Sequence, residues 1–129
     1  MEITFLYWNN AYFGILPLPN FETTKWFRIM GRVEVSYDNY KDATIFMSEE
    51  YDYDQYDIDN IMVHEMIHYY LYLTGEDSII CHGKAFKRMA ADVNTKFGLC
   101  VSKYYDTTFT PLIEGYSKIR KFFSFLEFL

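Results

Sequence analysis

The feature that most constrains this chain is a pair of histidines inside an almost wholly apolar stretch. His64 and His68 stand four residues apart, so on a helix both imidazoles project from one face and can reach a single ion. The apolar neighbours predict a buried central helix rather than an amphipathic surface helix. They are Ile61, Met62, Val63, Met66, Ile67, Leu71 and Leu73. Imidazoles in such a helix need partners, because burying polar groups unpaired is costly, and a metal ion is one such partner.

A histidine on an apolar helix is more often a core residue with satisfied hydrogen bonds than a metal ligand, and the spacing also arises by chance. The third histidine of the chain, His82, favours the metal interpretation, since it follows a break at residues 75–78 and opens the next segment. Three protein ligands with one open position characterise a catalytic zinc site, whereas a structural site takes a fourth protein ligand. We therefore expect His64, His68 and His82 to bind one Zn2+ per chain.

Glu65 stands between the two helical histidines and completes the HExxH pattern typical of zinc hydrolases. It lies near the face of His64 and His68 without being needed as a ligand. A carboxylate in that place suits a general base that takes a proton from the attacking water, and we assign this catalytic role to Glu65. Cys81, next to His82, is the alternative third ligand, because thiolate sulfur also binds zinc.

Several stretches of the sequence resemble the SprT-like family of zinc metalloproteases. Residues 64–68 read His-Glu-Met-Ile-His and residues 82–86 read His-Gly-Lys-Ala-Phe, with Asn94 further on. Together they are similar to the family signature of HExxH, HGxxF and N. Residues 8–19 resemble the N-terminal part of the family pattern, and residues 45–48 resemble one of its strands.

The resemblance implies an α+β fold with a zincin-like arrangement, in which a small mixed sheet packs on the central HExxH helix. It places the SprT-like metalloprotease domain in residues 1–106 and favours His82 over Cys81 as the third ligand. Residues 107–129 lie beyond this domain. The apolar residues of 112–129 recur at helical spacing, which predicts an additional C-terminal amphipathic helix that packs on the domain.

The implied activity is zinc-dependent endopeptidase hydrolysis of protein or peptide substrates, with DNA-associated proteins among the candidates. We expect the substrate peptide to add in extended form along an exposed strand edge near residues 43–48. Two other functions stay open. One is a catalytically silent interaction module of the same fold, against which an intact Glu65 argues. The other is a structural zinc-binding protein, which a fourth protein ligand such as Cys81 would identify.

The composition limits the partners of the chain. Its 129 residues fit one domain, and a net charge of −6, from 18 acidic and 12 basic residues, disfavours a broad phosphate-binding surface. DNA is therefore a partner that the resemblance suggests and the charge does not support. The two cysteines fit reduced thiols, and neither a signal peptide nor an apolar run long enough to cross a membrane is evident. We expect a cytoplasmic protein without a membrane partner, and the sequence leaves its oligomeric state open.

The remaining pattern predicts the elements around the central helix. The acidic stretch 49–59 is expected to be a solvated loop in which Asp57 or Asp59 caps that helix. Gly75 should end the helix, and residues 107–111 should form a linker. The other expected elements are a helix over 3–12 ended by Gly14, strands over 21–28, 33–37 and 43–47, a turn at 38–39, a helix opened by 82–83 and ended by Gly98, and an edge strand over 99–105.

Overall fold

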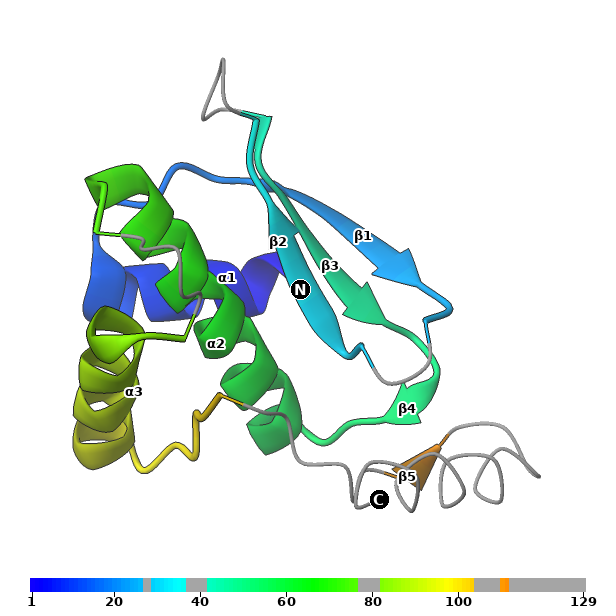
Figure 1. The fold of residues 1–129 in the computed structure, drawn as a ribbon. Coiled ribbons are helices and arrows are strands. Elements are labelled where there is room, and N and C mark those ends of the chain that lie inside the picture. The colour runs from blue at the N-terminus through cyan, green and yellow to red at the C-terminus, as the bar shows by residue number, and fades with distance from the viewer. Residues whose placement is uncertain (27–28, 37–41, 77–81, 104–109, 112–129) are drawn as a thin grey trace, which may run out of the picture.

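The computed structural model describes residues 1–26, 29–36, 42–76, 82–103 and 110–111 (Figure 1). In these ranges three α-helices and a short π-helix accompany a small mixed sheet and a two-stranded pairing, which confirms the α+β class. The helices are α1 (Glu2–Trp8), the π-helix η1 (Asn9–Phe13), α2 (Gln55–Thr74) and α3 (Lys84–Phe97). The strands are β1 (Asn20–Thr24), β2 (Gly31–Glu34), β3 (Thr44–Ser48), β4 (Tyr51–Asp52) and β5 (Thr110–Pro111).

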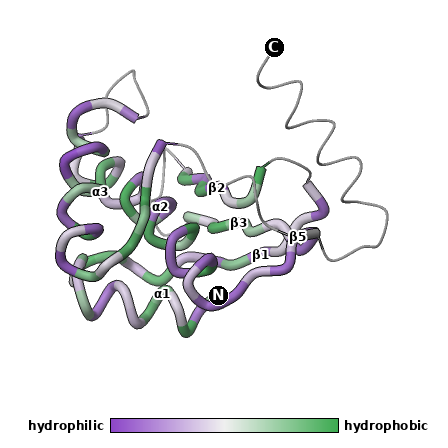
Figure 2. Tube along the Cα trace, turned by 90° about the horizontal axis from the view of Figure 1, so that it is seen from below, coloured by the Kyte–Doolittle hydropathy of each residue, from purple (hydrophilic) through white to green (hydrophobic). Residues whose placement is uncertain are grey.

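The helix α2 is the element around which the others are arranged. It packs against β2, against α1 and against α3. Figure 2 shows the hydrophilic turns of α3 at the edge of the molecule, with α2 between α3 and the strands. Five apolar residues of α2 have no exposed surface, namely Ile61, Met62, Val63, Met66 and Ile67. The prediction of a buried central helix is thus confirmed.

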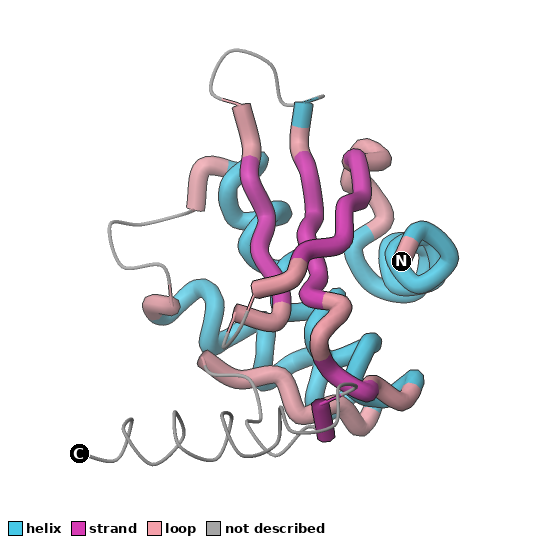
Figure 3. The backbone as a smooth tube through the Cα atoms, turned by 90° about the vertical axis from the view of Figure 1, so that its right-hand side faces the viewer, coloured by secondary structure: helices cyan, strands magenta, loops and turns pink. Residues whose placement is uncertain are grey.

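The three longer strands form a single layer in the order β1-β3-β2 (Figure 3). β3 runs parallel to β1, with Thr44 opposite Asn20, and antiparallel to β2, with Met47 opposite Gly31. The expectation of an exposed edge at residues 43–48 is therefore wrong, because β3 is the central strand and its backbone groups pair on both sides. The edges of this sheet are β1 and β2, and β2 is the edge strand that packs on α2.

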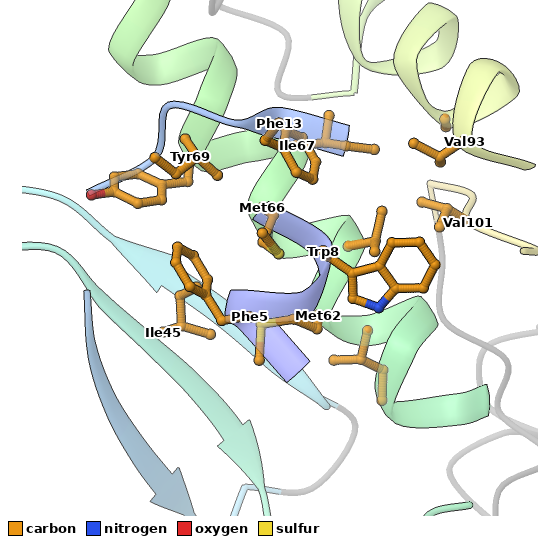
Figure 4. Packing of buried hydrophobic residues seen from close by; sticks show 14 of the residues in the cluster. Phe5, Trp8, Phe13, Ile45, Met62, Met66, Ile67, Tyr69, Val93 and Val101 are labelled. Carbon is orange, nitrogen blue, oxygen red and sulfur yellow. The ribbon is translucent and has the colours of Figure 1, made fainter. Parts of the chain in front are cut away.

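The hydrophobic core lies between the sheet and the helices. Ile45 and Met47, which are two residues apart on β3, are both buried, as expected for the covered face of a strand. Figure 4 shows Phe5 and Trp8 of α1 gathered with Met62 of α2 in the same cluster. The N-terminal helix therefore completes the core and holds α2 against the sheet.

The N-terminal helix begins as an α-helix and continues as a π-helix. The sequence predicts one helix over residues 3–12, and the structure continues α1 as the π-helix η1, which ends at Gly14 as predicted. Gly14 has a φ of 81°, a left-handed value that glycine adopts without strain. The side chain of Asn9 then holds the backbone of Leu16, accepting from its N–H at 3.2 Å and donating to its C=O at 3.0 Å.

The N-terminus of α2 is capped by Asp54, not by Asp57 or Asp59 as expected. The Asp54 carboxylate accepts from the Asp57 N–H at 2.8 Å, and the Asp57 carboxylate accepts from the Asp54 N–H at 3.1 Å. This reciprocal pair is a capping box, which satisfies two backbone donors that the first turn leaves free. Asp59 lies a turn further on and accepts instead from the Trp8 indole N–H at 3.0 Å. At the other end, Gly75 stops α2 as predicted.

The acidic stretch before α2 is partly buried rather than a solvated loop. Glu50 and Tyr51 are 7% and 3% exposed. Tyr51–Asp52 form β4, which pairs antiparallel with β5 at Thr110–Pro111, where the sequence predicts a linker. A strand pairing across the chain therefore replaces part of both predicted loops.

Other expectations are met in part. β1 ends at Thr24, short of the predicted end, and residues 99–103 join no strand ladder in the described part of the chain. The helix α3 begins after His82-Gly83 and ends before Gly98, as expected. The predicted turn at 38–39, Cys81 and the predicted helix at 112–129 lie outside the described residues. Among the described helices, none has the length and hydropathy needed to span a bilayer.

The capping box predicts a measurable loss of stability for Asp54→Ala. Without the carboxylate the Asp57 N–H loses its acceptor, which should lower the free energy of unfolding by about 1 kcal/mol. Asp54→Ser should recover most of the loss, because a hydroxyl oxygen accepts the same hydrogen bond. Chemical denaturation of both variants measures the effect, and an alanine variant as stable as the wild type would contradict the cap.

Candidate metal centre

Two elements bring the three histidines of the chain together. His64 and His68 project from successive turns of α2, and His82 lies in the turn just before α3. Their Nε2 atoms are 3.2 Å apart between His64 and His68, 3.0 Å between His68 and His82, and 3.3 Å between His64 and His82. The three residues predicted from the sequence as ligands therefore converge on one point, and the group could hold a metal ion.

The spacing of the three nitrogens fits one tetrahedral ion. Imidazole nitrogens at about 2.0–2.1 Å from a tetrahedral Zn2+ lie about 3.3 Å from one another. The observed separations of 3.0–3.3 Å are close to that value. Three mutual hydrogen bonds cannot form among these Nε2 atoms. Each Nε2 of a neutral imidazole either carries a proton and donates or lacks one and accepts, and an N–H can point at only one neighbour. Three neutral imidazole nitrogens at this spacing could hold a metal ion, and zinc is an ion that such nitrogens bind.

The imidazoles are held in the neutral form that binds metal. Burial, with a smaller contribution from the neighbouring histidines, lowers the pKa of His64 to about 3 and that of His68 to about 4. Burial and the positive charge of Lys103 lower the pKa of His82. The ring of Phe86 lies against all three imidazoles, with centroids 4.8–4.9 Å away. Neutral rings beside an apolar wall offer lone pairs to an ion without first losing protons.

The second ring nitrogen of His64 is also engaged. Its Nε2 faces the other histidines, so the hydrogen bond between the imidazole and the backbone of Ser102 must use Nδ1. That bond raises the pKa of His64, which means that the ring donates and the Ser102 carbonyl accepts. A proton fixed on Nδ1 leaves the Nε2 lone pair free, as in metal sites whose ligands are oriented by outer hydrogen bonds.

Glu65 lies beside the histidine triangle and is 4% exposed. Its Oε1 is 4.0 Å from the Nε2 of His64. Burial raises the pKa of the Glu65 carboxyl to about 8, although a hydrogen bond from the Val33 backbone and the positive charge of Arg32 oppose the shift. The structure thus places the predicted general base next to the predicted ligands, in surroundings that favour its taking up a proton.

The hydrogen bond from Val33 reaches Glu65 from the edge of the sheet. The C=O of Met30, just before β2, accepts from the Ser48 N–H at 2.8 Å. Along an antiparallel ladder, residues whose backbone groups bond to the partner strand alternate with residues whose groups point away from it. Val33 is three residues after Met30, so its backbone N–H and C=O point away from β3 and toward the outer edge. The Val33 N–H on that edge donates to the Glu65 carboxylate. The edge strand therefore orients the candidate base.

Sequence reasoning missed both backbone partners, Val33 and Ser102. Every residue carries the same N–H and C=O, so no side-chain pattern marks them in advance. The sequence marks Phe86 as the last residue of the HGxxF motif, but its contact with the three imidazoles comes from the way α3 packs on α2. In the described ranges, the histidine group is the one cluster of three metal-ligating side chains.

The raised pKa of Glu65 predicts that the stability of the metal-free protein falls as the pH rises. Between the ordinary value of 4.5 and about 8, the folded state keeps a proton that the unfolded chain has released. Glu65→Gln lacks this carboxyl. We therefore compare the melting temperatures of Glu65→Gln and the wild type, both in chelator. The value for Glu65→Gln minus the value for the wild type should increase from about pH 5 to about pH 8.

The three histidines act in the opposite direction without disturbing this comparison. Their pKa values are lowered on folding, so they destabilise the folded protein as the pH falls below 6.5, equally in both proteins. Glu22→Gln, which removes one carboxyl group at an exposed site on β1, is the matched control. A difference between Glu65→Gln and wild type that does not change with pH would refute the buried proton.

Comparisons with known proteins agree with the motif. The model of the SprT-like family matches residues 2–105, which include α1, α2, α3, the three-stranded sheet and all three histidines. A comparison with curated proteins gave no match. The matched region covers most of the 129 residues and confirms the resemblance drawn from residues 64–68 and 82–86. The chain therefore belongs to the SprT-like family.

Proposed function

We propose that this protein is a zinc-dependent endopeptidase with a zincin-like active site. His64, His68 and His82 would hold the ion, and Glu65 would be the general base. The observation that carries the proposal is the meeting of three imidazole nitrogens, 3.0–3.3 Å apart, with a buried carboxyl group 4.0 Å from one of them. Membership of the SprT-like family supports the same reading.

The chemistry divides between the ion and the protein. Bound zinc would polarise the scissile carbonyl and make water more acidic, which is the Lewis-acid role of the metal. Glu65 would take a proton from the attacking water and pass it to the amine of the leaving fragment. Its burial and its hydrogen bond from Val33 hold the carboxyl in place for both transfers.

An extended substrate would add at β2 rather than at β3. In the described part of the chain β2 pairs on one side only, and its other side is the edge at which Val33 meets Glu65. A peptide added along that edge would bond to main-chain groups of β2 other than the Val33 N–H, which already donates to Glu65, and main-chain hydrogen bonds accept many sequences. We therefore propose protein or peptide substrates. DNA is not included, because the net charge of −6 gives no support for phosphate binding.

The ligand assignment predicts one zinc per chain and its loss in His82→Ala. Removing one of three protein ligands should weaken zinc binding by far more than tenfold, while the exposed variant Lys87→Ala on α3 should bind as the wild type does. Elemental analysis and competition with a coloured chelator measure both. Undiminished zinc in His82→Ala would exclude His82 and bring Cys81 forward as the ligand.

The base assignment predicts that Glu65→Gln keeps the metal and loses hydrolysis. The amide has the size of the carboxyl but cannot take the proton, so cleavage of casein or a peptide should drop by at least about a hundredfold at saturating zinc. Zinc content is measured in the same samples. Cleavage at the wild-type rate by the zinc-loaded variant would show that Glu65 is not the base.

A further inference from the structure

Residues 98–102, here called the α2 strap, lie along α2 after the end of α3 (Figure 1). The Tyr56 hydroxyl donates to the C=O of Gly98 at 3.1 Å, and the Asn60 side chain accepts from the N–H of Cys100 at 2.7 Å. The third link is the hydrogen bond between His64 and the backbone of Ser102. The contacts advance by four residues along the helix and by two along the strap.

This spacing gives the strap its direction. Four helical residues rise by about 6.0 Å and two extended residues by about 6.6 Å, so an extended chain stays in register beside a helix. The strap therefore runs in the same direction as α2 and brings its last carbonyl to the metal centre. In the described part of the chain the strap joins no strand ladder, and side chains of α2 and α3 bind its backbone groups instead.

Asn94, near the end of α3, holds the strap between its last two anchors. Its carboxamide accepts from the Val101 N–H at 2.7 Å and donates to the Val101 C=O at 2.9 Å. One side chain thus binds both polar groups of the residue that precedes Ser102. The Val101 side chain is 5% exposed and lies beside Val93 of α3 (Figure 4). A residue fixed in this way leaves the next carbonyl little freedom.

We propose that Asn94 is a positioning residue of the metal centre. By clamping Val101 it holds the Ser102 carbonyl against His64, keeps the proton of that imidazole on Nδ1, and leaves the Nε2 lone pair directed at the ion. This inference rests on the proposed metal site and not on the proposed hydrolysis. The hydrogen bonds described for the Asn94 side chain go to Val101 and not to the histidines, so Asn94 acts through the strap.

The chain contains a matched control for the structural part of this effect. Asn9 binds both backbone groups of Leu16, seven residues further on, just as Asn94 binds those of Val101. Leu16 is also 5% exposed, so the two clamps hold equally buried residues. Among the interactions described for Asn9, none involves the histidines. Asn9→Leu should therefore destabilise the fold without altering the metal centre.

The experiment compares Asn94→Leu, Asn9→Leu and the wild type in two measurements. The tautomer of His64 in the metal-free protein at neutral pH is read from imidazole 15N shifts, with the signals assigned by difference against His64→Ala. Zinc affinity is measured by competition with a chelator. In the wild type we expect the Nδ1–H tautomer. In Asn94→Leu we expect a mixture of tautomers. We also expect zinc affinity to fall by at least about tenfold, as is typical when a hydrogen bond that orients a metal ligand is lost.

Asn9→Leu should match the wild type in both measurements. An unchanged tautomer and unchanged zinc affinity in Asn94→Leu would overturn the proposal, and so would equal changes in the two leucine variants. If Asn94→Leu does not fold, Asn94→Asp takes its place, since a carboxylate still accepts from the Val101 N–H but cannot donate to its C=O. Its expected changes are smaller and in the same direction, and none at all would again overturn the proposal.

The outcome is separable from that of the proposed function. A wild type that binds zinc but cleaves nothing would end the proposal of an endopeptidase and leave the role of Asn94 intact. If the wild type cleaves substrate while Asn94→Leu keeps the His64 tautomer and the zinc affinity of the wild type, the endopeptidase proposal stands and the role of Asn94 falls.

Discussion

Burial of the polar residues of α2 is the constraint on which the rest of the structure depends. His64 and Glu65 are each 4% exposed in a helix whose other buried residues are mostly apolar. A buried imidazole or carboxyl group without a partner destabilises a fold, so each has to be satisfied by a neighbour. The neighbours come from three separate elements: β2 at Val33, the α2 strap at Ser102 and the turn before α3 at His82. Two polar residues of one helix thus account for the placement of three other parts of the chain.

Main-chain groups supply two of these partners, which makes the site depend on the fold rather than on more side chains. Val33 belongs to a strand already paired with β3, and the strap is fixed by side chains from α2 and α3. A carbonyl or N–H held in this way cannot rotate out of reach as a side chain can. Phe86 covers the histidines with an apolar surface, and in such low-dielectric surroundings the remaining hydrogen bonds are stronger than they would be in water.

The histidine group and its helix could be predicted because their signals are local. A spacing of four places two histidines on one face, and glycines with left-handed φ end α2 and α3 where the apolar pattern stops. The central position of β3 could not be predicted, because residues 43–47 show the same alternation whether a strand has one neighbour or two. The cap at Asp54 was missed because three aspartates stand within six residues, each chemically able to cap. The contacts of Val33 and Ser102 use atoms common to all residues, so only the three-dimensional arrangement reveals them.

The position of His82 outside α2 has a mechanical consequence. An ion shared by His68 and His82, 14 residues apart in sequence, would be a cross-link between the central helix and the start of the next one. It would restrain the relative movement of α2 and α3 much as a disulfide does, but a chelator or acid can remove it. The rigidity of this junction would then follow the supply of metal, so that the same ion would set both the reactivity of the centre and the mechanical coupling of two helices.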